Sequence, residues 1–98
     1  MATLLVTLTA APDQDSARGR YVAGVQPLLK AAGGRPVKRL RVTDAIVGSA
    51  GTSMALVMDF DSADAIADVF TSAAYQALVA DRDTAFSNIE ILITEDAE

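Results

Sequence analysis

The segment from Phe60 to Arg82 constrains the fold of this chain more than any other. It closes an apolar strand, starts a helix, breaks near Thr71 and Ser72, and then starts a second helix. Ser62 and Ser72 are each typical of a helix N-cap, and Asp64 lies in the first turn after Ser62, where the helix dipole favours a carboxylate. We therefore predict two consecutive helices here, and the rest of the chain must supply the surface on which they pack.

Each of these two helices carries one stripe of apolar side chains at helical spacing. In the first helix the stripe comprises Ala65, Ile66, Val69 and Phe70. In the second helix it comprises Tyr75, Leu78, Val79, Arg82 and Phe86, with Asp81 and Asp83 toward solvent. The second stripe therefore includes an arginine at the border of the predicted core.

Four further segments have the patterns of strands. Ala2 to Thr9 alternates with a period of two, and Ser53 to Phe60 and Asn88 to Thr94 are apolar on both faces. Arg35 to Gly48 is predicted to form a long, charged strand that pairs with Ser53 to Phe60 through a turn at Ser49 to Thr52. These two segments make a hairpin.

The first helix is predicted to begin near Pro12, with carboxylates in its first turn. Its apolar face comprises Ala17, Tyr21, Val25, Leu28, Leu29 and Ala32. Pro27 lies inside this run and cannot donate a helical hydrogen bond, so we expect a kink or a break near Gly24 to Gln26. Gly33 and Gly34 supply the left-handed residue that ends the helix.

The element order is therefore β-α-β-β-α-β, which is typical of the α+β class and of the ferredoxin-like arrangement. A chain of 98 residues provides one domain, residues 1–98. We predict a four-stranded antiparallel sheet with the helices all on one face. Because the predicted strands are apolar on both faces, a second copy is expected to cover the other face in a homodimer, burying about 800 Å² per partner.

Composition excludes several function classes. The net charge of −5 disfavours nucleic acid and anionic membrane surfaces as partners, because both are themselves negative. The chain has no cysteine and no histidine, so it lacks the thiolate nucleophile, the usual general base and the usual transition-metal ligands. We expect no metal, no cofactor and in particular no histidine-ligated heme. Neither a signal peptide nor a membrane span is indicated, so a cytoplasmic protein is expected.

Two short motifs stand out: Asp59-Phe60 at the end of the predicted third strand, and Gly33-Gly34-Arg35 at the end of the predicted first helix. They occur together with Tyr21, Pro27, Ser62, Phe70, Ser72, Tyr75 to Leu78 and Arg82. In these residues the chain resembles the dimeric α+β barrel superfamily and, within it, a stand-alone family known as domain of unknown function 1330. The resemblance implies a pocket between the sheet and the helices, and the wider superfamily includes cofactor-free monooxygenases, cyclases, isomerases and heme-degrading enzymes as well as members without an assigned activity.

The chain also departs from this family at three places. Asp44 to Gly48 replaces a hairpin in which relatives carry a Glu-Gly pair and an aromatic residue, Asp61 replaces a proline, and Ala73-Ala74 replaces Pro-Glu. These changes separate the chain from any function specific to a subfamily.

Four side chains are the candidate site, and each has a structural alternative. The phenols of Tyr75 and Tyr21 could donate to a ligand oxygen, or they could be core residues whose hydroxyls bond to the backbone. Arg82 could hold a carboxylate or enolate, or it could form a salt bridge to Asp59 or to an acid on the last strand. Asp59 could be a base with a raised pKa, or an ionised partner of Arg82 or Arg35.

Other candidates favour structural interpretations. Arg39 and Arg41 project from one face of their strand and indicate a charged, solvated edge more than an anion site. Met54 and Met58 are typical of core fillers. Gly48 to Gly51 is a turn and lacks the lysine and the helix that follow a phosphate-binding loop.

The leading functional hypothesis is a cofactor-independent enzyme or binder of a small acidic or phenolic molecule, with Tyr21, Tyr75, Arg82 and Asp59 around an apolar pocket. Its chemistry would be cyclisation, isomerisation or oxygenation assisted by the substrate. The rival hypothesis is a non-catalytic dimeric module whose interior is filled by its own side chains. The volume of the cavity discriminates between them.

Overall fold

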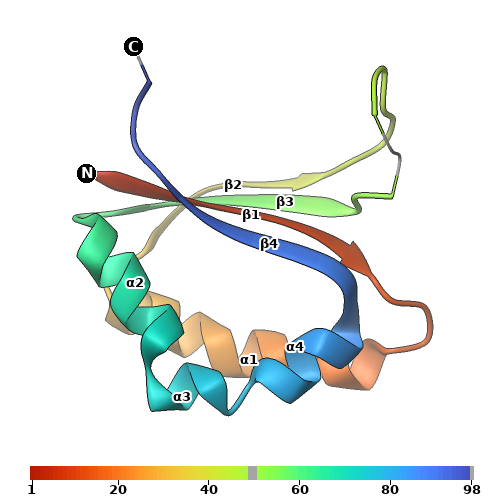
Figure 1. Ribbon diagram of the computed structural model, residues 1–98, viewed down its shortest axis with the longest axis horizontal. Helices are drawn as coiled ribbons and strands as arrows, with labels where there is room; N and C mark the ends of the chain where they lie inside the picture. Colours follow the sequence, from red (N-terminus) through yellow and green to blue (C-terminus); the bar gives the residue numbers. More distant parts are fainter. Residues whose placement is uncertain (49–50, 98) are drawn as a thin grey trace.

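One antiparallel sheet forms the frame of the molecule, and every helix lies on one face of it (Figure 1). The computed structural model describes residues 1–48 and 51–97. The strands, in the order β2-β3-β1-β4, are β1 (Ala2–Ala10), β2 (Arg35–Arg41), β3 (Met54–Phe60) and β4 (Phe86–Thr94). The helices are α1 (Asp15–Ala31), α2 (Ala63–Thr71), α3 (Ala73–Gln76) and α4 (Val79–Ala85). The predicted ferredoxin-like α+β fold is confirmed.

The pairing register decides which side chains meet the helices. Leu4 of β1 pairs with Met58 of β3, and the next pair along is Leu5 with Val57. Because successive side chains of a strand point to opposite faces, Leu4 and Met58 lie in the core beneath the helices while Leu5 and Val57 lie on the uncovered face. β1 and β3 occupy the centre of the sheet, as their apolar sequences predict.

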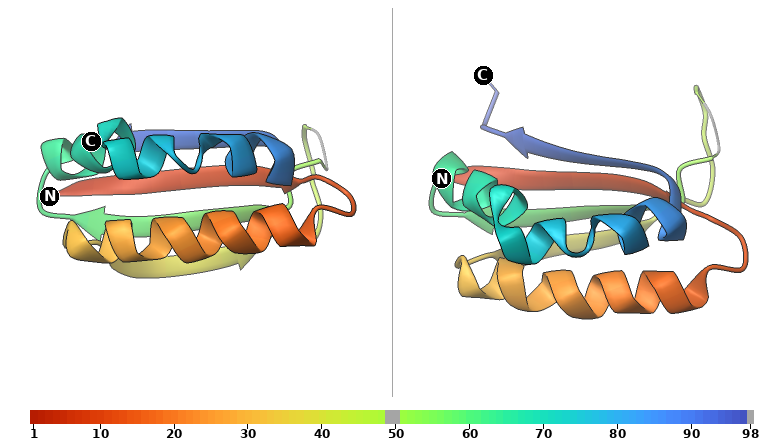
Figure 2. Two further views of the ribbon diagram at one scale, coloured as in Figure 1. Left: turned by 90° about the horizontal axis from the view of Figure 1, so that it is seen from below. Right: turned by 60° about the horizontal axis from the view of Figure 1, so that its bottom comes forward.

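The helical layer runs in two parallel rows. Figure 2 shows α1 along the β2 and β3 side of the sheet, and α2, α3 and α4 in succession along the β1 and β4 side. α1 packs chiefly against α4. The largest fully buried side chains are Leu4, Phe60, Ile66 and Tyr75, which come from both the sheet and the helices.

Both predicted serine caps are confirmed. The Ser62 Oγ accepts a hydrogen bond from the Ala65 amide at 3.1 Å, and the Ser72 Oγ accepts one from the Tyr75 amide at 3.2 Å. The helix after Ser72 differs from the prediction, because it is divided into α3 and α4. Phe86 does not extend the helical stripe: it opens β4, which pairs with β1 back to Ala10.

Two further predictions differ from the structure. Of the kink or break predicted before Pro27, the break is absent, because α1 runs without interruption from Asp15 to Ala31. Pro27 and the carbonyl that it leaves without a donor, that of Ala23, belong to exposed residues, so water can satisfy that carbonyl. The predicted strand from Arg35 to Gly48 ends at Arg41, because its partner strand begins only at Met54. The predicted turn at Ser49 to Thr52 lies partly outside the described residues.

The end of α1 follows the predicted chemistry. Gly33 has a φ of 86°, in the left-handed region, and its amide donates to the Lys30 carbonyl at 3.0 Å. The Gly34 amide then donates to the Leu29 carbonyl at 2.9 Å. Among the described residues no helix is both long and apolar enough to cross a lipid bilayer.

Candidate ligand cavity

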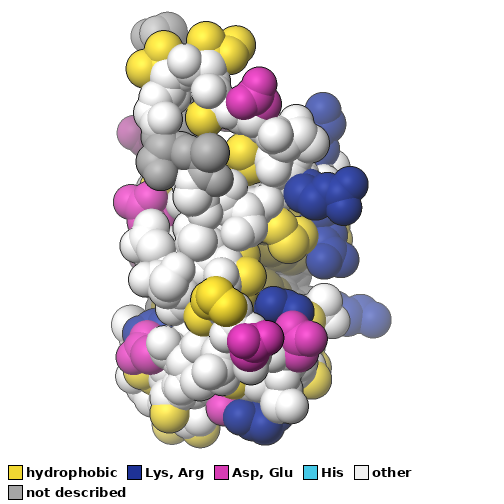
Figure 3. Space-filling model, turned by 90° about the vertical axis from the view of Figure 1, so that its right-hand side faces the viewer, with side chains coloured by type: hydrophobic (Ala, Val, Ile, Leu, Met, Phe, Trp, Pro, Cys, Tyr) yellow, Lys and Arg dark blue, Asp and Glu magenta, His cyan; other side chains and the backbone are white. Residues whose placement is uncertain are grey.

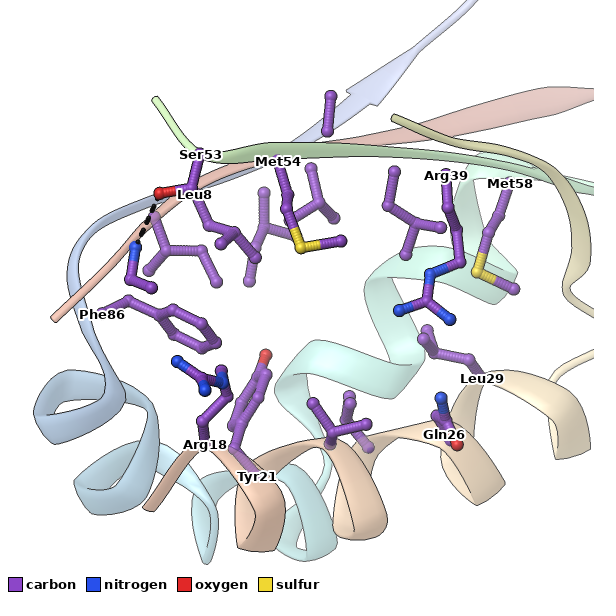
Figure 4. Close-up of a pocket in the computed structure, with 18 of the residues that line it drawn as sticks. Leu8, Arg18, Tyr21, Gln26, Leu29, Arg39, Ser53, Met54, Met58 and Phe86 are labelled. Atoms are coloured by element: carbon purple, nitrogen blue, oxygen red, sulfur yellow. Dashed lines mark hydrogen bonds between the residues drawn. The ribbon is translucent and has the colours of Figure 1, made fainter. Parts of the chain in front are cut away.

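A cavity of about 710 Å³ lies between α1 and the sheet. Its walls are mainly aliphatic and aromatic side chains, and Figure 4 shows Leu8, Met54 and Met58 on the sheet side with Tyr21 and Leu29 opposite. Met54 and Met58, predicted to fill the core, have their thioethers beside this space. The further lining residues used below are Asp15, Arg18, Gly19, Gln26, Arg39, Leu56 and Phe86.

The cavity opens between α1 and the edge strand β2. Gln26 and Arg39 both line it and both are exposed, so they mark its opening. Figure 4 shows the Arg39 guanidinium extending from the sheet toward the side of α1 that carries Gln26 and Leu29. At the far end Phe86 closes the space beside Tyr21 (Figure 4).

Three side chains, Tyr21, Tyr75 and Arg82, are linked by hydrogen bonds, and the first of them lines the cavity. The hydroxyls of Tyr21 and Tyr75 lie 2.9 Å apart, and the Arg82 Nη1 donates to the Tyr75 hydroxyl at 3.3 Å. Arginine is a donor only, so the Tyr75 oxygen accepts from it. This arrangement favours donation of the Tyr75 proton to the Tyr21 oxygen, which leaves the proton of Tyr21 available for a further acceptor.

Burial and these hydrogen bonds change the acidity of the groups. Burial raises the pKa of the Tyr21 phenol far above its usual range. The hydrogen bond to Tyr75 raises the pKa of the Arg82 guanidinium, which remains partly exposed. Tyr21 is therefore a neutral hydrogen-bond donor at physiological pH, and Arg82 is a cation.

Ring contacts hold the two tyrosines in place. The Tyr21 ring meets Phe86 edge to face at a centroid distance of 5.6 Å, and the Tyr75 ring meets Phe70 in the same manner at 4.7 Å. The Arg82 guanidinium carbon lies 5.9 Å from the centre of the Tyr75 ring, within the range of a cation–π contact. The rings are thus fixed by packing as well as by hydrogen bonds.

The structure brings three of the four candidate side chains together, and only Tyr21 of the four lines the cavity. Tyr75 contacts the Tyr21 hydroxyl outside the cavity, and Arg82 donates to Tyr75. Asp59 is elsewhere: its carboxylate lies on the uncovered face of the sheet and accepts a hydrogen bond from Thr3 Oγ1 at 2.7 Å. Arg82 pairs with Asp83 at 3.1 Å, an acid that neither structural alternative had named.

Sequence reasoning did not single out Gln26 and assigned Arg39 to a solvated edge. The reason is a bulge at Val37, where the register of β2 against β3 shifts between Pro36 and Lys38. The bulge places Arg39 opposite Leu56, a cavity residue, and turns Leu40 to the uncovered face. A strict period of two from Pro36 would predict the reverse, and no signal in the sequence marks the extra residue.

The remaining charged lining groups neutralise each other. Arg18 and Asp15 form an ion pair within the first turn of α1. Across the described part of the chain, no three acidic side chains gather where they could hold a metal ion.

Comparison with known proteins reveals a family and a fold. Residues 3–97 match the model of the family described as "Domain of unknown function (DUF1330)". The chain has no match among the curated proteins.

Three solved structures illustrate the similarity in fold. A protein of unknown function from Rhodopseudomonas palustris superimposes with a TM-score of 0.80 at 17% identity, covering 99% of this chain and 83% of that one. A protein from Bacteroides fragilis, described as dimeric and ferredoxin-like, gives 0.65 at 12% identity, covering 97% and 95%. An ethyl tert-butyl ether d (ethd) family protein from Bacillus halodurans gives 0.62 at 19% identity, covering 99% and 100%. At these identities the likeness concerns the fold alone.

Proposed function

This chain belongs to the family described as "Domain of unknown function (DUF1330)", and we propose that it binds a small, largely apolar molecule in the cavity beneath α1, with Tyr21 donating a hydrogen bond to an oxygen of that molecule. The observation that carries the proposal is the cavity itself. Its volume of about 710 Å³ lies within the usual range of small-molecule pockets. A module filled by its own side chains would not leave such a space.

The chemistry of the walls supports a ligand with few polar groups. Apolar surface favours an apolar body, and one well-placed donor then fixes its orientation. Tyr21 is suited to this role, because its neighbours Tyr75 and Arg82 orient its oxygen as an acceptor and leave its proton free. A carbonyl, ether or phenol oxygen on the ligand would be a suitable acceptor.

The raised pKa of Tyr21 limits the reactions that the site could support. A phenol that stays protonated can stabilise developing negative charge on an oxygen, but it does not abstract a proton at neutral pH. The acid beside the cavity, Asp15, is engaged by Arg18. Binding, with hydrogen-bond stabilisation of an oxyanion if a reaction follows, is therefore the function that we propose ahead of base-catalysed isomerisation.

We also propose that the protein forms a homodimer through the uncovered face of the sheet. Leu5 pairs with Val57 on one side and with Leu92 on the other, so these three apolar side chains cross the middle of that face. Leu92 is 42% exposed. The Bacteroides fragilis protein with a similar fold is described as dimeric, which agrees with a dimer but does not identify its interface. Such a dimer would leave the helix-covered cavity open.

The ligand proposal can be tested with two matched probes. 4-Phenylbutan-2-one carries an apolar body and a ketone, and butylbenzene lacks the oxygen. In a titration followed by amide chemical shifts in nuclear magnetic resonance, we expect both to perturb residues of α1 and β3, with the ketone binding more tightly. Tyr21→Phe should weaken the ketone by about fivefold, the worth of one neutral hydrogen bond, and leave butylbenzene unchanged.

A cavity-filling variant completes the test. Leu56→Trp should abolish binding of both probes because the larger side chain occupies the space, whereas Leu56→Met, which conserves volume, should retain it. If neither probe binds to the unaltered protein, the proposal is contradicted.

A further inference from the structure

We propose that the ligand of this cavity carries a carboxylate, and that Arg39 on the edge strand β2 binds it at the opening. The inference rests on the proposed function and narrows it from apolar molecules in general to apolar carboxylic acids. It assigns to Arg39 the anion-binding role that the sequence of β2 favours less than a solvated edge.

The fold directs Arg39 to the cavity. The bulge at Val37 sets Arg39 opposite Leu56, on the face that the helices cover, and Arg39 lines the cavity while it remains exposed. Figure 4 shows its guanidinium over the space between the sheet and α1. Arg41 projects from the same face two residues farther on, but it does not line the cavity.

Arg39 is also a cation without a partner. Four other arginines pair with aspartates, in the pairs Arg18–Asp15, Arg20–Asp81, Arg35–Asp61 and Arg82–Asp83. Within residues 1–48 and 51–97, Arg39 forms no ion pair or hydrogen bond with another side chain. In a protein with a net charge of −5, an unpaired guanidinium beside an apolar cavity is a distinctive arrangement.

The surroundings of Arg39 increase its attraction for an anion. β2 carries Arg35, Lys38, Arg39 and Arg41 and is exposed along its whole length. Figure 3 shows Lys and Arg side chains gathered along one side of the molecule, with hydrophobic surface beside them. The field of this strand would steer a negative group to the opening of the cavity.

The donor set fits a carboxylate better than a phosphate. A guanidinium binds the two oxygens of a carboxylate with parallel hydrogen bonds, and the Gln26 amide across the opening provides an additional donor. Each further charge on the ligand would need another donor, but the other charged lining groups, Arg18 and Asp15, pair with each other, and most of the remaining wall is apolar. A monoanion with an apolar body is therefore the matching class.

The spacing along α1 sets the separation of the two polar ends. Tyr21 and Gln26 are five residues apart, which corresponds to a rise of about 7.5 Å along a helix. A ligand whose carboxylate meets Arg39 and Gln26 would therefore place a second oxygen, roughly 7 Å away, within reach of Tyr21. The proposed ligands are therefore apolar acids of two kinds. They carry a second oxygen roughly 7 Å from the carboxylate, or they have an apolar body of about that length.

The test compares 4-phenylbutanoate with 4-phenylbutanamide, which has the same shape and no charge. We expect the unaltered protein to bind the acid about tenfold more tightly than the amide at neutral pH and low salt. Arg39→Gln should remove this preference by weakening the acid about tenfold while leaving the amide within twofold. Arg41→Gln is the matched control, and it should leave both affinities within twofold.

Equal affinity for acid and amide in the unaltered protein would overturn the inference, as would an equal loss of acid binding in the Arg41→Gln variant. If 4-phenylbutan-2-one binds in the cavity but the acid gains nothing from Arg39, only the carboxylate assignment fails. If none of the probes binds, the proposed function fails with it. Arg39→Lys, which keeps the charge but loses the planar fork, should recover part of the preference.

Discussion

The hydroxyl oxygens of Tyr21 and Tyr75 lie 2.9 Å apart in the interior and join helix α1 to helix α3. Both side chains are buried, with 6% and 2% of their surface exposed. The interaction links the wall of the cavity to the second helical row, and Arg82 anchors it from the other side. The stability of the fold and the orientation of the candidate site therefore depend on the same contact.

Substitution of the two tyrosines should reveal this coupling. We expect Tyr75→Phe to lower the free energy of unfolding by about 1–2 kcal/mol, because it leaves the Tyr21 hydroxyl without its buried partner. Tyr21→Phe should cost less, since Tyr75 keeps its bond from Arg82. Urea unfolding of the double variant should show a loss smaller than the sum by about 0.5–1.5 kcal/mol. Simple additivity would mean that the two hydroxyls do not interact.

Alkaline titration should distinguish Tyr21 from an ordinary phenol. The chain has two tyrosines and no tryptophan, so the ultraviolet absorbance of tyrosinate reports on these two groups. Because burial raises the pKa of Tyr21, we expect the folded protein to gain less tyrosinate absorbance than two ionised phenols would give at pH values just above the usual tyrosine pKa of about 10. Unfolding in urea at the same pH should release the full signal of both.

The same shift makes stability depend on pH. Above about pH 10 the unfolded chain loses the Tyr21 proton while the native protein retains it, so the native state binds more protons and stability falls as pH rises, by up to about 1.4 kcal/mol per pH unit. Below that pH the contribution of the neutral phenol is fully present. Tyr21→Phe should make the alkaline decline shallower. An unchanged slope in this variant would show that Tyr21 titrates normally.

Two glycine substitutions should have opposite effects on stability. A Cβ on Gly34 would come within 2.9 Å of the Leu29 carbonyl oxygen and 2.7 Å of the Phe60 ring, so Gly34→Ala should destabilise the fold by about 1–3 kcal/mol. Among the described residues, a Cβ on Gly19 would meet no atom within 4 Å beyond its chain neighbours and the backbone of its own helix, and Gly19 lies inside α1. Gly19→Ala should therefore stabilise by about 0.5–1 kcal/mol. Thermal unfolding of the two variants checks both signs.

The proposed dimer predicts a specific sensitivity of the uncovered face. Leu5→Lys puts a charge in the middle of the apolar row formed with Val57 and Leu92, and it should reduce the mass in solution from twice the chain mass of 10.2 kDa to the chain mass itself. Ala31→Lys, at the exposed end of α1, introduces the same charge and should leave the mass unchanged. Light scattering after size-exclusion chromatography measures both. A monomeric unaltered protein at micromolar concentration would refute the arrangement.

Much of the fold could be predicted from local chemistry. Ser62 and Ser72 cap helices because their hydroxyls satisfy amides that have no helical partner, and that requirement is visible in the sequence. The left-handed turn at Gly33 is also visible in the sequence, because glycine has no Cβ and adopts a positive φ readily. Such signals depend on a few neighbouring residues, so they identify elements without knowledge of the tertiary structure.

The candidate site was harder to predict, because it depends on which residues face each other across the sheet. Asp59 lies in the otherwise apolar strand β3. The pairing register places its carboxylate on the uncovered face of the sheet, where it accepts a hydrogen bond from Thr3. The sequence shows that Tyr21 and Arg82 lie on the apolar faces of helices. It does not show that Tyr75 connects them, because that contact depends on how α1 packs against the second helical row. The residue at which β2 ends is likewise determined by the start of its partner strand β3, and not by the residues of β2 itself.

The bulge at Val37 means that the side chains at the rim of the cavity are set by strand register as well as by residue type. If the same residues paired without the bulge, Lys38 and Leu40 would face the helices in place of Arg39 and Arg41. A chain with this fold can therefore change the side chains at the rim by gaining or losing a bulge in an exposed edge strand, while the buried packing of the helices stays intact. The edge strand is the place where ligand preference can diverge at the lowest risk to folding.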